Sequence, residues 1–313
     1  MIHSTLETNQ LAGLSKTESV FPAATLEVNR LFRLTAGQHL LRACLRTGSA
    51  VMPRLTAELA YQIWSKPRRR KQHKLIELPS GGMPFEIPHR GRMLRGLRWG
   101  ITGPKILLVH GWESHLGRMS TFVEPLLDAG YQVLALDGPG HGRSDHWVTN
   151  AIDFGDGLKS LIIEVGGIDG LVAHSFGASA ALFMFERNLN LLPNRLVCIA
   201  PMVHMRIHLR IFQSLSAVSN QVLERMEEMI TKRIGVNCSN WHLLDIPRRL
   251  NRPGLIIHDI DDQVVSPCWS DQLLANWPKG SLVSTRGLGH NRILKDAMVV
   301  ERVTRFFSTS GSA

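Results

Sequence analysis

Short, continuously apolar runs recur through most of the chain and are separated by longer segments of mixed character. The clearest runs are residues 105–110, 132–137, 170–173, 196–200, 254–258 and 282–285. A run without polar alternation is typical of a parallel strand that is buried on both faces. Segments long enough for a helix lie between most of them, at 119–129, 157–165, 178–187 and 267–277. This order predicts an α/β domain, with helices on both faces of a mostly parallel sheet.

Two weaker strands precede these runs. Residues 74–77 and 92–99 have strand character, and Gly81 and Gly82 between them predict a turn. Further along, the interval between Ala200 and Pro253 is too long for a simple crossover, and helices are expected at 207–218 and 221–234. We therefore predict a helical cap at about 202–250, above the carboxyl ends of the strands, where open α/β sheets bind ligands.

The N-terminal part differs from the rest. Residues 1 to about 35 are polar and weakly periodic, whereas apolar residues at 36–64 recur at three- and four-residue steps, as on one face of a helix. Pro53 is expected to split this segment into two helices. Their apolar face is predicted to pack on the main domain, with contact to a membrane surface as the alternative. We expect an N-terminal helical extension with a basic linker at 1–74 and the main domain at 75–313.

Composition narrows the class of protein. The 313 residues are 44% hydrophobic and 20% charged, which is typical of a globular chain with a large core. No apolar stretch approaches the roughly 18 residues that span a bilayer, and the amino terminus lacks a signal-peptide pattern. A cytoplasmic protein is expected. The four cysteines form no CxxC pair, so neither a zinc site nor a disulfide framework is predicted.

A net charge of +10 is partly concentrated between Lys66 and Lys74. This basic stretch is interpreted as a solvated connector. Peripheral contact of residues 36–74 with anionic lipid head groups is the alternative. Nucleic acid is not expected as a partner, because no recognised binding motif accompanies the charge.

The chemistry centres on Ser175, where an apolar strand runs through a serine into a helix rich in small residues. A serine on a sharp strand-to-helix turn projects its hydroxyl above the sheet, and small residues two positions away relieve crowding. Those positions are Ala173 and Gly177. The stretch resembles the nucleophile elbow of the α/β-hydrolase superfamily, which implies an α/β-hydrolase fold for roughly residues 75–313. Ala173 stands where the family usually has glycine, so the turn must form with a methyl group present.

His110, Gly111 and Trp112 follow the run that ends some sixty residues before Ser175. In the family that the chain resembles, backbone N–H groups after the His-Gly pair and after the nucleophile form an oxyanion hole. The resemblance thus assigns these donors to Trp112 and Phe176. His110, Gly111 and Met202 are expected to contact substrate. A plain strand-ending turn at 110–111 is the alternative.

In this family the serine acts with a histidine base and an acid that orients the histidine, together called the catalytic triad. The candidates for the acid and the base lie after the last two apolar runs. The family's acid stands four residues after a strand-ending histidine, here His258, which selects Asp262 and leaves Asp261 as the alternative. Asp259 occupies a position where glycine is usual. The glycine-flanked His290 lies 28 residues beyond Asp262. Serine, acid and histidine therefore occur in the order expected for this fold.

The resulting expectation is a serine hydrolase that cleaves small carboxylic esters with short to medium acyl chains. It needs no cofactor, and no metal site is predicted. The loop 137–144 is interpreted as structural, and His141 is not expected to act as a base. Thioesterase, lipase, membrane-surface hydrolase and non-catalytic binding protein are the alternatives, and the oligomeric state is left open.

Overall fold

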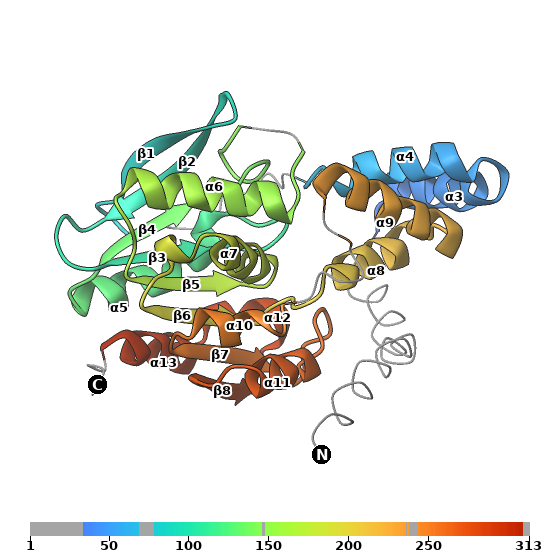
Figure 1. The fold of residues 1–313 in the computed structure, drawn as a ribbon. Coiled ribbons are helices and arrows are strands. Elements are labelled where there is room, and N and C mark those ends of the chain that lie inside the picture. Colours follow the sequence, from blue (N-terminus) through green and yellow to red (C-terminus); the bar gives the residue numbers. More distant parts are fainter. Residues whose placement is uncertain (1–33, 69–77, 146–147, 236, 238–242, 309–313) are drawn as a thin grey trace, which may run out of the picture.

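An eight-stranded sheet forms the centre of the computed structural model, which describes residues 34–68, 78–145, 148–235, 237 and 243–308 (Figure 1). The strand order is β1-β2-β4-β3-β5-β6-β7-β8. β1 and β2 are antiparallel, as are β2 and β4, and all other neighbours are parallel. The strands are β1 Met83–His89, β2 Arg92–Trp99, β3 Lys105–Val109, β4 Gln132–Leu136, β5 Gly170–His174, β6 Arg195–Ile199, β7 Gly254–Asp259 and β8 Gly280–Thr285.

Helices cover both faces of this sheet, which confirms the predicted architecture. Because successive side chains of a strand point to opposite faces, Leu107 and Val109 of β3 face one layer while Ile106 and Leu108 face the other. The first layer holds α6 (Ala151–Glu164), α7 (Phe176–Arg187), α10 (Ile246–Leu250) and α11 (Cys268–Ala275). The second holds η2 (Leu116–Phe122), α5 (Val123–Asp128), η4 (Ile293–Lys295) and α13 (Ala297–Ser308). Double coverage explains why the strands read as unbroken apolar runs.

The first strand was not predicted where it occurs. β1 starts after Gly82 and reaches β2 through a turn at Arg90 and Gly91, both with positive φ, of 48° and 75°. Pro84 and Pro88 argue against a central strand, but an edge strand tolerates proline because one side of it donates no ladder hydrogen bonds. The strand expected at 74–77 lies outside the described residues, as does nearly all of the polar lead-in at 1–35.

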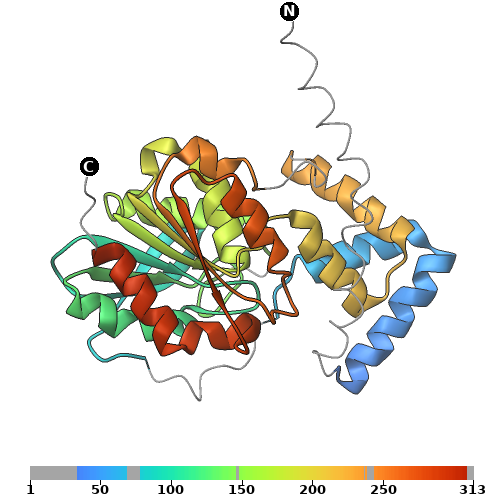
Figure 2. The same ribbon diagram turned by 90° about the horizontal axis from the view of Figure 1, so that it is seen from below.

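Four helices form a separate layer beside the sheet domain (Figures 1 and 2). They are α3 (Ala36–Val51), α4 (Pro53–Trp64), α8 (Met205–Ser216) and α9 (Asn220–Ile234), and the break at Pro53 occurs as predicted. α4 packs on α9 and α3 on α8. The Arg42 side chain donates to the carbonyl of Leu215 at 2.8 Å, and Arg233 pairs with Glu58 at 2.9 Å. The two N-terminal helices and the cap helices thus form one packed unit.

The prediction that the apolar face of residues 36–64 packs on the main domain is wrong for most of its members. Leu45 and Ala60 are buried, whereas five others are exposed: Leu40, Leu41, Val51, Leu55 and Leu59. The helices contact the cap through a different set that includes Tyr61 and Trp64. Within the described part of the chain, no helix is both long and apolar enough to cross a membrane.

Candidate active site

Ser175 occupies the turn between β5 and α7. Its φ of 52° and ψ of −122° place it in a region that side chains rarely adopt. The backbone approaches closely here, since a Cβ on Gly177 would lie 2.2 Å from the carbonyl oxygen of His110. Position 177 therefore requires glycine. At position 173, by contrast, alanine is accommodated, and it is fully buried within β5.

Ser175, His290 and Asp262 lie in one hydrogen-bonded chain. The Ser175 hydroxyl lies 3.0 Å from Nε2 of His290, and Nδ1 of His290 lies 2.7 Å from Oδ2 of Asp262. The carboxylate can only accept, so Nδ1 carries a proton and Nε2 is left to accept from the serine. This is the arrangement that a general base needs in order to activate a serine hydroxyl.

The Asp262 carboxylate is held by main-chain donors as well. Its Oδ1 accepts from the backbone N–H groups of Val264 at 2.8 Å and Val265 at 3.0 Å. Burial works to raise the pKa of Asp262, but hydrogen bonds from His258 and His290 outweigh it and hold this pKa well below the usual value. Asp262 is therefore an ionised acceptor beside His290.

Two further residues, which sequence reasoning missed, orient this carboxylate. Nε2 of His258 lies 3.2 Å from Oδ2 of Asp262, so this oxygen faces two imidazole rings. Nε2 of His258 faces two acceptors, this carboxylate and the Val265 carbonyl, and so carries the proton; on the other side of the ring, Nδ1 accepts from the Ser270 hydroxyl at 2.6 Å. His258 is the last residue of the apolar run 254–258, after which the sequence analysis placed the acid, but nothing in the sequence indicates Ser270.

The neighbouring aspartates bond the loop that carries His290. Asp261 accepts from the backbone N–H of Gly287 at 2.9 Å. Asp259 accepts from the Thr285 hydroxyl at 2.7 Å and from the N–H of Leu288 at 3.0 Å. Of the two candidates for the acid, the structure brings Asp262 and not Asp261 to the histidine. Asp259, which stands where the family usually has glycine, thus links the loop that carries His290 to the turn that carries Asp262.

The two expected oxyanion donors, Trp112 and Phe176, lie beside each other with ring centroids 4.9 Å apart. Their backbone N–H groups donate to no other described residue. Gly111 lies against the nucleophile, because a Cβ there would lie 3.2 Å from Cβ of Ser175. Unoccupied N–H groups next to the serine are what an oxyanion hole requires.

The structure does not support the expected substrate contact of His110. Its ring is fully buried and bonds the main chain on both sides, accepting from Gly138 N–H at 3.0 Å and contacting the Gly111 carbonyl at 2.7 Å. Met202 is buried against the nucleophile turn, where its carbonyl accepts from the Ser179 hydroxyl. The hydrogen bonds of His110 to Gly111 and Gly138 therefore hold the backbone of the oxyanion loop in place.

Cap and N-terminal helices roof the oxyanion loop through aromatic contacts. The ring of His208 in α8 lies 4.6 Å from Trp112 and 5.3 Å from Phe176, and 5.3 Å from Trp64 at the end of α4. Nδ1 of His208 has no hydrogen-bond partner in the described structure. Burial lowers the pKa of His208 to about 3. The ring is thus a neutral packing element at neutral pH.

Another buried histidine, His174, precedes the nucleophile. Its Nε2 lies 2.9 Å from the carbonyl oxygen of His290, and the two rings are 4.8 Å apart. Burial, followed by the proximity of His290, lowers the pKa of His174 well below its usual value. A neutral His174 donates this hydrogen bond and holds the His290 backbone in place.

The buried His208 predicts an acid-sensitive fold. In the unfolded chain a histidine binds a proton near pH 6.5, whereas folded His208 does so only near pH 3. Its stabilisation is fully present above pH 6.5 and is lost as pH falls toward 3, by about 1.4 kcal/mol per pH unit. His208→Phe should remove that slope from the free energy of unfolding, measured by urea denaturation across pH. The exposed His39, changed to glutamine, is the control, and equal slopes in wild type and His208→Phe would contradict the assignment.

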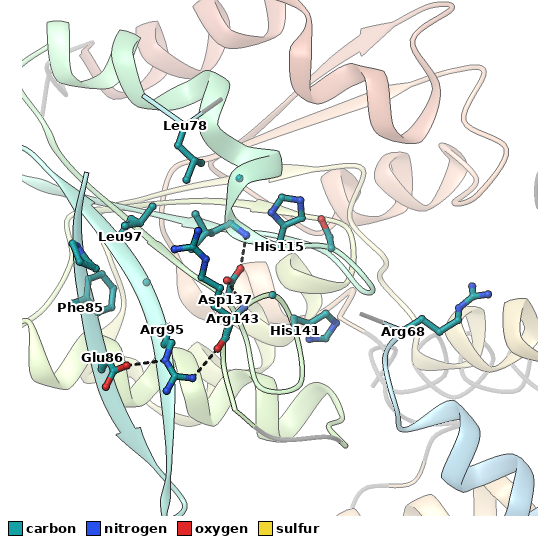
Figure 3. Close-up of a pocket in the computed structure, with 16 residues that line it drawn as sticks. Arg68, Leu78, Phe85, Glu86, Arg95, Leu97, His115, Asp137, His141 and Arg143 are labelled. Atoms are coloured by element: carbon teal, nitrogen blue, oxygen red, sulfur yellow. Dashed lines mark hydrogen bonds and ion pairs between the residues drawn. The ribbon is translucent and has the colours of Figure 1, made fainter. Parts of the chain in front are cut away.

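A cavity of about 160 Å³ is lined in part by residues 114–117, which follow the oxyanion loop in the chain (Figure 3). Its lining includes Asp137, whose carboxylate accepts from the N–H groups of Leu116 at 2.7 Å and Arg143 at 2.9 Å. Ser175, Asp262 and His290 are absent from that lining. Two of its cations are already paired, Arg95 with Glu86 and Arg68 with Glu113. The cavity therefore belongs to the framework that shapes the loop.

Comparisons with known proteins support the fold. Residues 106–225 match the model of the alpha/beta hydrolase family. The chain is 41% identical over 63 residues to a serine hydrolase-like protein of Danio rerio, a match that spans 20% of this chain and 19% of that protein. An esterase of Pyrococcus furiosus superposes with a TM-score of 0.60 at 18% identity, over 77% of this chain and 98% of its own. An esterase of Exiguobacterium antarcticum gives 0.57 at 15% identity, over 73% and 100%. At such identities the structural likeness shows the fold.

Proposed function

We propose that this chain, a member of the α/β-hydrolase superfamily, is a serine hydrolase that cleaves carboxylic esters through an acyl-enzyme on Ser175. The observation that carries the proposal is the hydrogen-bonded chain from Ser175 through His290 to Asp262, with distances of 3.0 and 2.7 Å. A serine with its base and orienting acid in one line is the arrangement that acyl transfer needs.

In the first half of the reaction, the Ser175 oxygen attacks the ester carbonyl while Nε2 of His290 takes its proton. Asp262 stabilises the imidazolium that forms, since its carboxylate stays ionised beside Nδ1. The N–H groups of Trp112 and Phe176 receive the negative charge that develops on the carbonyl oxygen, each contributing about 3 kcal/mol to the transition state. His290 then protonates the departing alcohol.

In the second half, a water molecule attacks the acyl-enzyme. His290 removes its proton, the same N–H groups stabilise the second oxyanion, and Ser175 leaves with the proton returned by His290.

Substrate size follows from how the site is enclosed. Ser175 is only 4% exposed, and the rings of Trp112, Phe176 and His208 pack against one another at the two residues that carry the oxyanion donors and at the cap. An apolar, enclosed site favours a small acyl group with apolar character over a long chain or a peptide. We therefore retain short to medium acyl esters as the substrate class.

Hydrolysis of p-nitrophenyl acetate, butyrate, octanoate and palmitate by the purified chain tests this class. The expected result is a higher kcat/KM for the shorter esters than for palmitate, because the aromatic roof limits the depth of the acyl site. Acyl-CoA substrates and emulsified triglyceride are assayed alongside. Preference for acyl-CoA would favour a thioesterase, and activity that rises steeply only with an emulsion would favour a lipase. Absence of turnover on all of them would contradict the proposal.

A further inference from the structure

Apolar side chains are exposed unusually densely on the two N-terminal helices. Of twelve large exposed apolar side chains in the described residues, six lie between positions 40 and 59. We call these six the N-terminal apolar surface: Leu40, Leu41, Val51, Met52, Leu55 and Leu59. Their exposed fractions run from 38% to 69%. Such a concentration marks an interaction surface rather than the scattered exposure found on most proteins.

Helical spacing gathers these residues on faces of α3 and α4 that are exposed in the described part of the chain. On α3, Leu40 and Val51 lie eleven residues apart, three turns along one face, and the exposed Cys44 lies between them. On α4, Leu55 and Leu59 are four residues apart. The opposite faces already bind the cap, for example where the N–H of Ser219 donates to the Ser49 hydroxyl at 3.2 Å. The surface is therefore surplus to the packing of the helices.

The charged side chains of the two N-terminal helices themselves are almost all positive. Within residues 34–68, Glu58 is the single acidic residue, and Arg233 pairs with it at 2.9 Å. Arg46 and Arg54 are exposed and bond no other described residue through their side chains. Aliphatic side chains flanked by free arginines complement a bilayer surface, where acyl chains lie beneath anionic phosphates.

We infer that the N-terminal apolar surface docks this protein onto an anionic lipid surface. None of the six members is aromatic, whereas protein interfaces concentrate much of their binding energy in tryptophan and tyrosine anchors. The location adds a functional consequence, because Trp64 at the end of α4 contacts His208 above the oxyanion loop. Docking would hold α4 against the membrane by its outer face, while its inner face stays packed beside the active site.

Co-sedimentation of the full chain with vesicles tests the inference. Vesicles of phosphatidylcholine with phosphatidylglycerol are compared with vesicles of phosphatidylcholine alone. The triple change Val51→Ser, Leu55→Ser and Leu59→Ser should lower partitioning onto the anionic vesicles by about tenfold or more, because three insertable side chains are lost. Arg46→Gln with Arg54→Gln should lower it as well, and more strongly at low than at high salt.

A matched control removes equally exposed apolar side chains elsewhere, through Ile101→Ser, Ile163→Ser and Leu189→Ser. It should pellet like the wild type. Equal pelleting of the two triple variants, or no wild-type binding to anionic vesicles, would overturn the inference. A wild-type dimer that the Val51, Leu55 and Leu59 changes dissolve would also overturn it, by assigning the surface to a second copy of the chain.

A reporter at Cys44 locates the contact. With Cys238→Ser and Cys268→Ser in the background, an environment-sensitive fluorophore on Cys44 should shift to the blue when anionic vesicles are added. An unchanged spectrum in a bound protein would place the contact elsewhere and overturn the role of this surface. Turnover of a water-soluble ester is measured for every variant, so failure of docking and failure of the proposed hydrolysis are read separately.

Discussion

Replacing Ser175 with alanine should lower kcat for ester hydrolysis by on the order of 10⁶-fold. Within the described residues, no other hydroxyl forms a hydrogen bond with Nε2 of His290, so the acyl-enzyme cannot form. Hydrolysis by the oxyanion hole and binding alone is expected to remain, about 10³-fold above the reaction in water. The measurement is steady-state turnover of p-nitrophenyl butyrate, with labelling by a fluorophosphonate as a second readout.

The folded state should tolerate this change. Ser175 is buried, but among the described residues its hydroxyl forms a hydrogen bond only with the His290 ring, and alanine meets the same backbone requirement at φ 52°. We expect the free energy of unfolding to change by less than about 1 kcal/mol. Ser284→Ala, at an exposed position on β8, is the matched control and should retain full activity. If Ser175→Ala still turns over at the wild-type rate, Ser175 is not the nucleophile.

The second large effect is expected from Asp262→Asn, which should lower kcat by about 10⁴-fold. One carboxylate oxygen of Asp262 faces the rings of His258 and His290, and the other accepts from two backbone N–H groups. An amide has one accepting and one donating end, so either orientation sets its NH₂ group against N–H donors. The imidazole of His290 then takes the tautomer that cannot accept the serine proton.

Asp261→Asn provides a closely matched control. Asp261 is exposed, stands one residue away and accepts from the N–H of Gly287, without a bond to His290. It should retain kcat within a few-fold. Asp262→Asn should also lose about 1–3 kcal/mol of stability, because a buried carboxylate with all its donors is disturbed. Single-turnover kinetics with both variants decide the matter, and a larger loss in Asp261→Asn would reverse the assignment of the acid.

The parallel strands could be predicted closely because burial on both faces requires an unbroken apolar run, and such runs are visible in one dimension. β3 and β4 were expected to within one residue of their observed ends. β1 was missed because its two prolines contradict an ordinary strand pattern, and only the free edge beside it makes proline acceptable.

The order of Ser175, Asp262 and His290 could be recognised because each residue lies in a turn after its own strand, and short sequence motifs indicate such turns. The residues that hold these three in position could not be recognised from short motifs. His258 and Ser270, or Trp64 and His208, belong to different elements and meet through packing. Likewise, the periodicity of residues 36–64 established two amphipathic helices, but which face would be covered depended on the shape of the cap helices.

Burial on both faces therefore determined the strands from the sequence itself, and short local motifs, through their resemblance to the α/β-hydrolase superfamily, indicated the elbow and the reacting residues. The tertiary structure decided which side chains share a carboxylate, which histidines stay neutral and which apolar faces remain exposed. The physical reason is that a turn or a strand depends on neighbours within a few residues. A contact between elements depends instead on the mutual fit of surfaces that lie far apart in the chain.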